Sequence, residues 1–95
     1  MEIEPTAALK RLYAAVLVLA SEEGSIEERL RTAYLDHLRA MPVDTLPERL
    51  RGEWRAIEVD LGRMYATQTP LERISHDKTV DVAQRVLLVY DSLIR

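Results

Sequence analysis

The stretch Gly24-Ser25-Ile26-Glu27-Glu28 predicts the end of one helix and the start of the next. Glycine readily adopts the left-handed backbone conformation that closes many helices. Ser25 and Glu28 have the S-x-x-E spacing of a capping box, in which the serine hydroxyl and the glutamate carboxylate each accept a hydrogen bond from a free backbone N–H. So short a connection predicts that the two helices form an antiparallel hairpin.

On both sides of this turn, apolar residues recur at the three-and-four spacing of an amphipathic helix. Upstream we expect a helix over residues 5–23, with Pro5 in its first turn, and we expect it to be the most buried of all. Its predicted core stripe is Leu9, Leu12, Tyr13, Val16 and Leu19, with Leu17 and Val18 widening it. Downstream we expect a helix over residues 26–41, which Pro42 ends.

Two further start signals follow along the chain. Thr45 and Glu48 repeat the capping-box spacing and predict a third helix over residues 46–65, in which Trp54 should anchor the core. Ser75 is a suitable N-cap for a fourth helix over residues 76–94. The sequence therefore predicts an all-α fold: a compact bundle of four amphipathic helices in a single domain, residues 1–95, with sequential neighbours antiparallel.

The composition limits the classes of function. The chain has 95 residues, a formal net charge of −3 and no block of like charges, which argues against binding to nucleic acid or to an anionic membrane. Cysteine is absent, so disulfides and thiol chemistry are excluded. The most apolar stretch, residues 12–20, is too short to span a bilayer. A cytoplasmic location is the expectation.

The fourth predicted helix is apolar on more than one side. Its predicted core stripe contains Val82, Val86, Tyr90 and Leu93, whereas Val80, Leu88 and Val89 fall outside that stripe. A second apolar face indicates either a central helix or contact with another chain. We expect Val80, Leu88 and Val89, together with Arg85, to form an interaction surface.

The segments Gly24-Ser25-Ile26-Glu27-Glu28-Arg29-Leu30, Ala33-Tyr34 and Leu46-Pro47-Glu48-Arg49-Leu50-Arg51 resemble a pattern in small bacterial helical proteins of no established activity. Ser75 followed by Val86-Leu87-Leu88-Val89-Tyr90-Asp91 is similar to the ending of those proteins. The resemblance implies a shared helical fold and a bacterial source. It supplies no functional residue.

One pair of residues suggests an enzyme. Arg31 and His37 have an R-x5-H spacing that resembles the motif of HEPN-type ribonucleases, in which histidine would serve as general acid or base and arginine would stabilise phosphate charge. Positions six apart on an α-helix are rotated by roughly 240° from alignment, which separates the two side chains. The simpler interpretation is two polar residues on a surface helix.

Three other groups of residues have a simpler structural interpretation. Glu72 and His76 are four apart, but Ser75 caps the helix between them, so we expect neither a metal site nor a cofactor. The four tyrosines, Tyr13, Tyr34, Tyr65 and Tyr90, lie on the apolar stripes and are expected in the core with their hydroxyls at the rim. Arg49, Arg51 and Arg55 alternate with acidic residues, which predicts a salt-bridged surface.

The sequence thus favours a non-enzymatic protein-interaction module: a small bacterial or phage-derived adaptor, inhibitor or antitoxin-like subunit. Its expected partner is another protein or a second copy of itself, and a homodimer through the fourth helix is the simplest form. The alternative is a HEPN-like ribonuclease that uses Arg31 and His37.

Overall fold

The computed structural model describes residues 7–65 and 70–95 of the chain. The described residues form a bundle of four helices: α1 (Ala7–Ser21), α2 (Ile26–Ala33), α3 (Glu48–Tyr65) and α4 (His76–Ile94). Three short turns lie between them: a π-helical turn, η1 (Tyr34–Leu38), and two 3₁₀ turns, η2 (Val43–Thr45) and η3 (Leu71–Arg73). The predicted all-α four-helix fold is confirmed. The predicted helical role of Pro5 lies outside the described residues.

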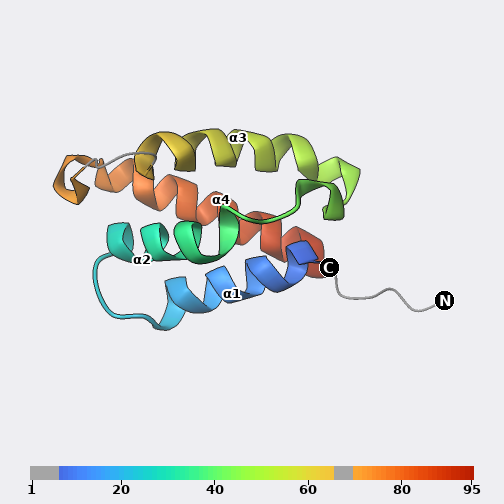
Figure 1. Cartoon of the computed structure of the whole chain (residues 1–95), viewed down its shortest axis with the longest axis horizontal. Coiled ribbons are helices and arrows are strands. Elements are labelled where there is room, and N and C mark those ends of the chain that lie inside the picture. The colour runs from blue at the N-terminus through green and yellow to red at the C-terminus, as the bar shows by residue number, and fades with distance from the viewer. Residues whose placement is uncertain (1–6, 66–69) are drawn as a thin grey trace.

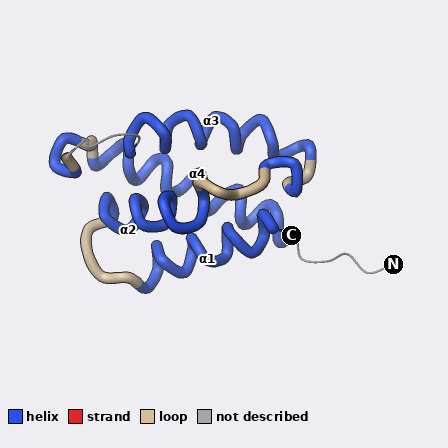
Figure 2. The backbone as a smooth tube through the Cα atoms, viewed as in Figure 1, coloured by secondary structure: helices blue, strands red, loops and turns tan. Residues whose placement is uncertain are grey.

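Sequential helices run in opposite directions (Figure 1). The α1/α2 hairpin forms one side of the bundle and the α3/α4 hairpin forms the other. α4 contacts all three other helices, whereas α1 contacts α2 and α4 and lies at the edge. The longest described connection, between η1 and α3, crosses one end of the bundle and contains η2 (Figure 2). Within the described residues, none of the helices is long and apolar enough to cross a bilayer.

The turn between α1 and α2 has the predicted geometry. Gly24 adopts a φ of 105°, a left-handed conformation that favours glycine. The Glu28 N–H donates to Ser25 Oγ over 3.1 Å and the Ser25 N–H donates to Glu28 Oε1 over 3.0 Å, so the capping box is complete. Arg29 donates from Nη1 to the Leu19 carbonyl at the end of α1 over 2.7 Å. This bond fastens the start of α2 to the end of α1.

The predicted capping box at Thr45 is wrong. α3 begins at Glu48, and the Thr45 hydroxyl lies in η2, where it donates to the Pro42 carbonyl over 2.7 Å. The same hydroxyl accepts from the Ala8 N–H over 3.1 Å. Thr45 therefore satisfies a free N–H at the start of α1 rather than at the start of α3.

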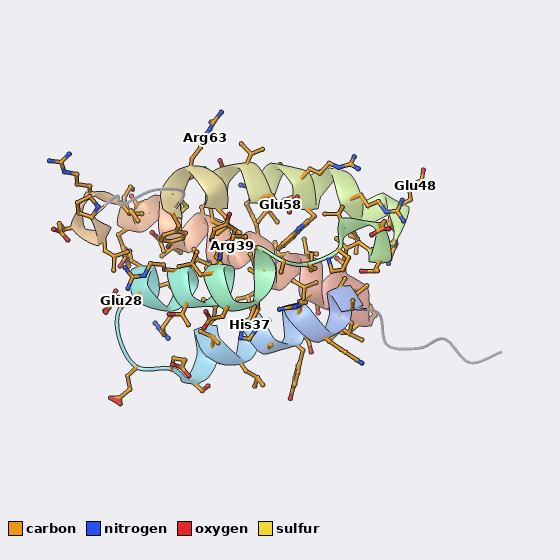
Figure 3. All side chains as sticks on the ribbon, in the orientation of Figure 1. Glu28, His37, Arg39, Glu48, Glu58 and Arg63 are labelled. Atoms are coloured by element: carbon orange, nitrogen blue, oxygen red, sulfur yellow. The ribbon has the colours of Figure 1, made fainter. Side chains whose placement is uncertain are left out.

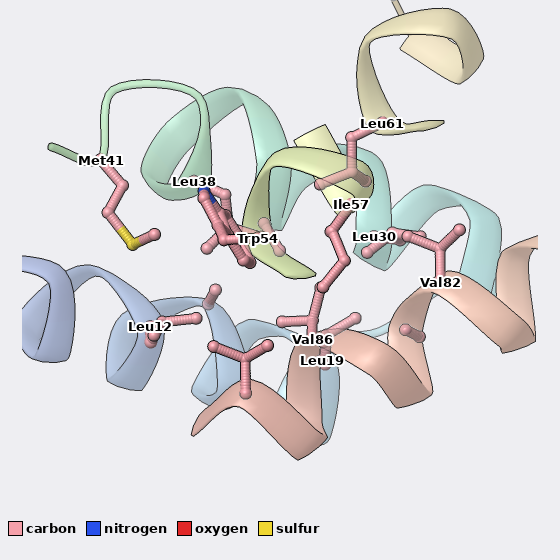
Figure 4. Close-up of a cluster of buried hydrophobic side chains, with 14 of the residues drawn as sticks. Leu12, Leu19, Leu30, Leu38, Met41, Trp54, Ile57, Leu61, Val82 and Val86 are labelled. Carbon is pink, nitrogen blue, oxygen red and sulfur yellow. The ribbon is translucent and has the colours of Figure 1, made fainter. Parts of the chain in front are cut away.

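The core runs between the two hairpins (Figure 4). Trp54 is fully buried, as predicted, and it packs within a cluster to which all four helices contribute. The largest fully buried apolar side chains are Trp54, Leu12, Leu30, Leu38, Leu46, Ile57, Leu61, Val82 and Val86. Burial of this apolar surface is the main source of stability for so small a domain. The predicted Ser75 cap also forms, accepting from the Lys78 N–H at the start of α4.

Candidate functional site

Apolar side chains remain exposed along the groove where α1 and α4 run side by side. Tyr13 is 52% exposed and Leu17 46% on α1, and Leu87 is 42% exposed and Ile94 54% on α4. With the partly buried Leu9 and Tyr90, these residues form what we call the α1–α4 face. Exposed apolar side chains that gather on one face often mark an interaction site on a monomer.

The expectation that the first helix is the most buried is wrong. Its buried residues are Ala8, Leu12, Ala15 and Leu19, so the core stripe is displaced by about one position from the predicted one. The displacement moves Tyr13 out of the core and leaves Leu17 on the surface. Because residues 12–21 contain no charge, the solvent side of α1 is apolar as well as the core side. A helix that is apolar all round is normally covered on all sides.

A hollow lies at one end of the α1–α4 face. It is lined by Leu9, Lys10, Tyr13, Tyr90 and Ile94 and has a volume of about 400 Å³. The rings of Tyr13 and Tyr90 have centroids 6.4 Å apart and form one wall. The aromatic pair and the aliphatic residues give this hollow the chemistry of a site for an apolar side chain.

The four predicted interaction residues differ in burial, although three of them lie at the same hollow between α3 and α4. Val89 is only 2% exposed and belongs to the core, so the prediction that it lies outside the buried stripe of the fourth helix is wrong. Val80 is half-buried, and Leu88 is 63% exposed beside the α3/α4 groove. Arg85 is held by acidic partners. Arg85, Leu88 and Val89 nevertheless line one hollow between α3 and α4, whereas Val80 is not among its lining residues. The interaction surface at these residues stays a prediction, and the sequence analysis did not identify the α1–α4 face as a unit.

Arg85 is the centre of an ion-pair cluster between α3 and α4. Its Nη1 lies 2.8 Å from Asp60 Oδ2, its Nε lies 3.2 Å from Glu53 Oε2, and Lys78 Nζ lies 3.1 Å from the same Asp60 oxygen. The hydrogen bonds from Arg85 and then Lys78 lower the pKa of Asp60 below its usual value. The cluster fastens α4 to α3.

The structure does not bring Arg31 and His37 together. Arg31 is exposed on α2, and His37 lies in the π turn, extending toward α1 in Figure 3. A π turn holds more residues than an α turn, so each residue rotates less and His37 falls even further from the side of Arg31. No hydrogen bond joins the two among the described residues. The ribonuclease alternative stays a prediction.

His76 is paired with a residue of α2 and not with Glu72, four positions before it. Its Nδ1 lies 2.9 Å from Glu27 Oε2 on α2, and the Tyr65 hydroxyl donates to the Glu27 carbonyl over 3.1 Å. Burial raises the pKa of Glu27, but the His76 hydrogen bond and the other donors outweigh it and the net pKa is lowered. Within residues 7–65 and 70–95, no cluster of three metal-ligating side chains occurs.

The predicted salt-bridged arginines bind backbone carbonyls instead. Arg49 donates to the Ser92 carbonyl over 3.3 Å, and Arg51 donates to the carbonyls of Leu46 and Asp44, each over 2.9 Å. Among the described residues, neither of these two arginines forms the predicted ion pair. Their role is to hold the ends of α3 and α4 and the loop before α3.

The tyrosines fall into two pairs rather than one core set. Tyr65 is buried and its ring centroid lies 6.0 Å from that of Tyr34, while Tyr13 pairs with Tyr90 at the surface. The expectation of a core position is confirmed for Tyr65 and wrong for Tyr13.

No family model matches this chain, and comparisons with curated proteins and with solved structures found no match.

Proposed function

We propose that this protein is a non-enzymatic interaction module, a small bacterial adaptor, inhibitor or antitoxin-like subunit of the cytoplasm, and that it binds another protein chain through the α1–α4 face. The observation that carries the proposal is the uncharged, half-exposed side of α1 beside the exposed Leu87 and Ile94 of α4. Leaving such a surface in water is unfavourable, and covering it with a partner removes the cost.

The residue types on this face support the proposal. Aromatic side chains are enriched and acidic ones depleted in the centres of protein interfaces, and this face presents Tyr13 and Tyr90 with no carboxylate between them. Helices carry all of its residues, so little backbone entropy is lost on binding. Two exposed apolar residues lie outside this face: Leu88 beside the α3/α4 groove, and Val59 among the charged residues Arg55, Glu58 and Arg63.

The proposal is tested with two variants matched in chemistry. Leu17→Glu combined with Leu87→Glu places carboxylates in the face, and Val59→Glu places one at a residue of similar exposure, 52%, on α3. Tagged chains are expressed in bacterial cells and chemically crosslinked in the extract. We expect wild type and Val59→Glu to give the same crosslinked species and the double variant to lose it. Equal crosslinking of all three chains, or no species with any, would contradict the proposal.

A further inference from the structure

We infer that the partner of the α1–α4 face is a second copy of this chain, packed against the first about a two-fold axis with its α1 antiparallel. This inference rests on the proposed function, because it names the occupant of the same face. Three independent properties of the face support it: the distribution of charge along it, the position of the hollow, and its area.

The two ends of α1 carry opposite charges, so two copies that pack antiparallel bring opposite charges together. Lys10 lies beside the hollow at one end of α1, and Glu22 and Glu23 follow the other end, with residues 12–21 uncharged between them. At 1.5 Å per residue, Lys10 and Glu22 are separated by about 18 Å along the axis. A two-fold axis near residues 15 and 16 places Lys10 of each copy beside the two glutamates of the other. A parallel arrangement would place like charges together.

The acidic end of α4 lies at the same end of the face as the acidic end of α1. Because α4 is antiparallel to α1, its first turns lie at the end of the face where α1 finishes (Figure 1). These turns carry the exposed Asp77, while Asp81 lies 3.7 Å from Arg85 Nη1 and Lys78 is directed to Asp60 on α3. At the opposite end, Arg95 Nε lies 2.8 Å from Asp91 Oδ2, and the exposed Lys10 lines the hollow. The acidic end of one copy thus matches the basic end of the other.

The hollow and the ridge of the face also match when reversed. The hollow lies level with residues 9–13 of α1, and the exposed Leu17 follows one turn later beside Leu87. The same two-fold axis brings Leu17 of each copy level with Tyr13 of the other, at the hollow. Both copies then use the same surface, and the contact between Leu17 of one copy and Tyr13 of the other occurs twice. This is the property of an isologous dimer.

The available area agrees with a weak but specific dimer. α1 is about 22 Å long at 1.5 Å per residue, and two packed helices together are about 20 Å wide. The face therefore covers on the order of 500 Å² per copy, so two copies bury on the order of 1,000 Å², near the lower limit for a specific interface. We expect association in the micromolar range rather than an obligate dimer.

The oligomeric state of the purified 95-residue chain tests the inference. In sedimentation velocity over a concentration series, we expect wild type and Val59→Glu to form dimers and Leu17→Glu with Leu87→Glu to dissociate at least tenfold more readily. Lys10→Glu and Glu23→Lys should each weaken the dimer, and the two together in one chain should restore it. A wild-type chain that stays monomeric throughout, or a dimer that the double variant leaves unchanged, would overturn the inference.

The antiparallel register is tested by disulfide trapping, which is clean because the native chain has no cysteine. We expect a mixture of the Lys10→Cys and Glu23→Cys chains to form a mixed disulfide dimer under mild oxidation. Each variant alone should crosslink far less. Efficient crosslinking of Lys10→Cys to itself would show a parallel arrangement and overturn the inference.

The failure of this inference differs from the failure of the proposed function. If the purified chain stays monomeric while the extract gives a crosslinked species that needs Leu17 and Leu87, the face binds a different protein and only the second copy is excluded. If neither the purified dimer nor the crosslinked species depends on Leu17 and Leu87, the inference and the proposed function both fail.

Discussion

The Thr45 hydroxyl accepts a hydrogen bond from the Ala8 N–H, 37 positions earlier in the chain, over 3.1 Å. Ala8 is fully buried, so this N–H has no access to water. The threonine thus closes the first turn of α1 from the loop that connects the two hairpins, and it holds that loop against α1 at one end of the bundle.

Replacement of Thr45 by valine should therefore destabilise the whole domain. The isosteric side chain keeps the volume but leaves the Ala8 N–H without an acceptor, which we expect to lower the free energy of unfolding by about 1–3 kcal/mol. Urea denaturation followed by far-ultraviolet circular dichroism measures the change. Thr45→Ser keeps the hydroxyl and is the matched control; a serine variant as unstable as the valine variant would show that the methyl group, and not the hydrogen bond, is what matters.

Among the described residues, one buried side-chain polar atom in the core has no hydrogen-bond partner. The indole N–H of Trp54 is buried and makes no hydrogen bond, while the ring itself is fully enclosed. Trp54→Ala should lower the free energy of unfolding by about 3–5 kcal/mol, because it leaves a cavity in the core. Trp54→Phe should cost less than half as much, because it removes the unsatisfied donor together with part of the ring. If urea denaturation gave the same decrease in the free energy of unfolding for both variants, it would contradict the prediction that the unpaired N–H destabilises the core.

Much of the fold follows from local sequence. The capping box at Ser25 and Glu28, the cap at Ser75 and the apolar periodicity predicted all four helices, because each signal depends on residues within one or two turns. The role of Thr45 could not be predicted in this way, since its partner is distant along the chain. The π turn at residues 34–38 likewise left no signal in the spacing.

The α1–α4 face was beyond prediction for a related reason. Periodicity shows which residues of α1 are apolar, but it does not show whether the chain has enough other helices to cover them. The long apolar run suggested deep burial, and the bundle covers only one side of it. The same run indicates a partner once the structure shows where the helix lies.

The cluster around Asp60 should make stability depend on acid pH. The pKa of Asp60 is lowered in the folded state, so its contribution is present above the ordinary value of 3.8 and is lost as pH falls through the lower folded value. Asp60→Asn should reduce stability at neutral pH by about 1–2 kcal/mol and flatten the loss on acidification. Thermal unfolding at a series of pH values measures both. Asp36→Asn, at an exposed residue outside the cluster, is the control. If the stability of Asp60→Asn fell with acid pH as steeply as that of wild type, the prediction would be contradicted.

At alkaline pH the sensitive group is Tyr65. Burial, and then the nearby charge of Glu27, raise the pKa of its phenol to about 12 from an ordinary value of 10.0. Because the pKa of Tyr65 is higher in the folded state, its contribution to stability is complete at a pH below the ordinary pKa. That contribution is lost as the pH rises through the folded-state pKa.

The difference in phenolate absorbance between wild type and Tyr65→Phe isolates this group from the other three tyrosines. We expect the difference to develop near pH 12, or earlier only together with loss of the helical signal. A difference that developed near the ordinary value of 10.0, with the helical signal intact, would show that the hydroxyl is open to solvent and that its bond to the Glu27 carbonyl does not hold in solution.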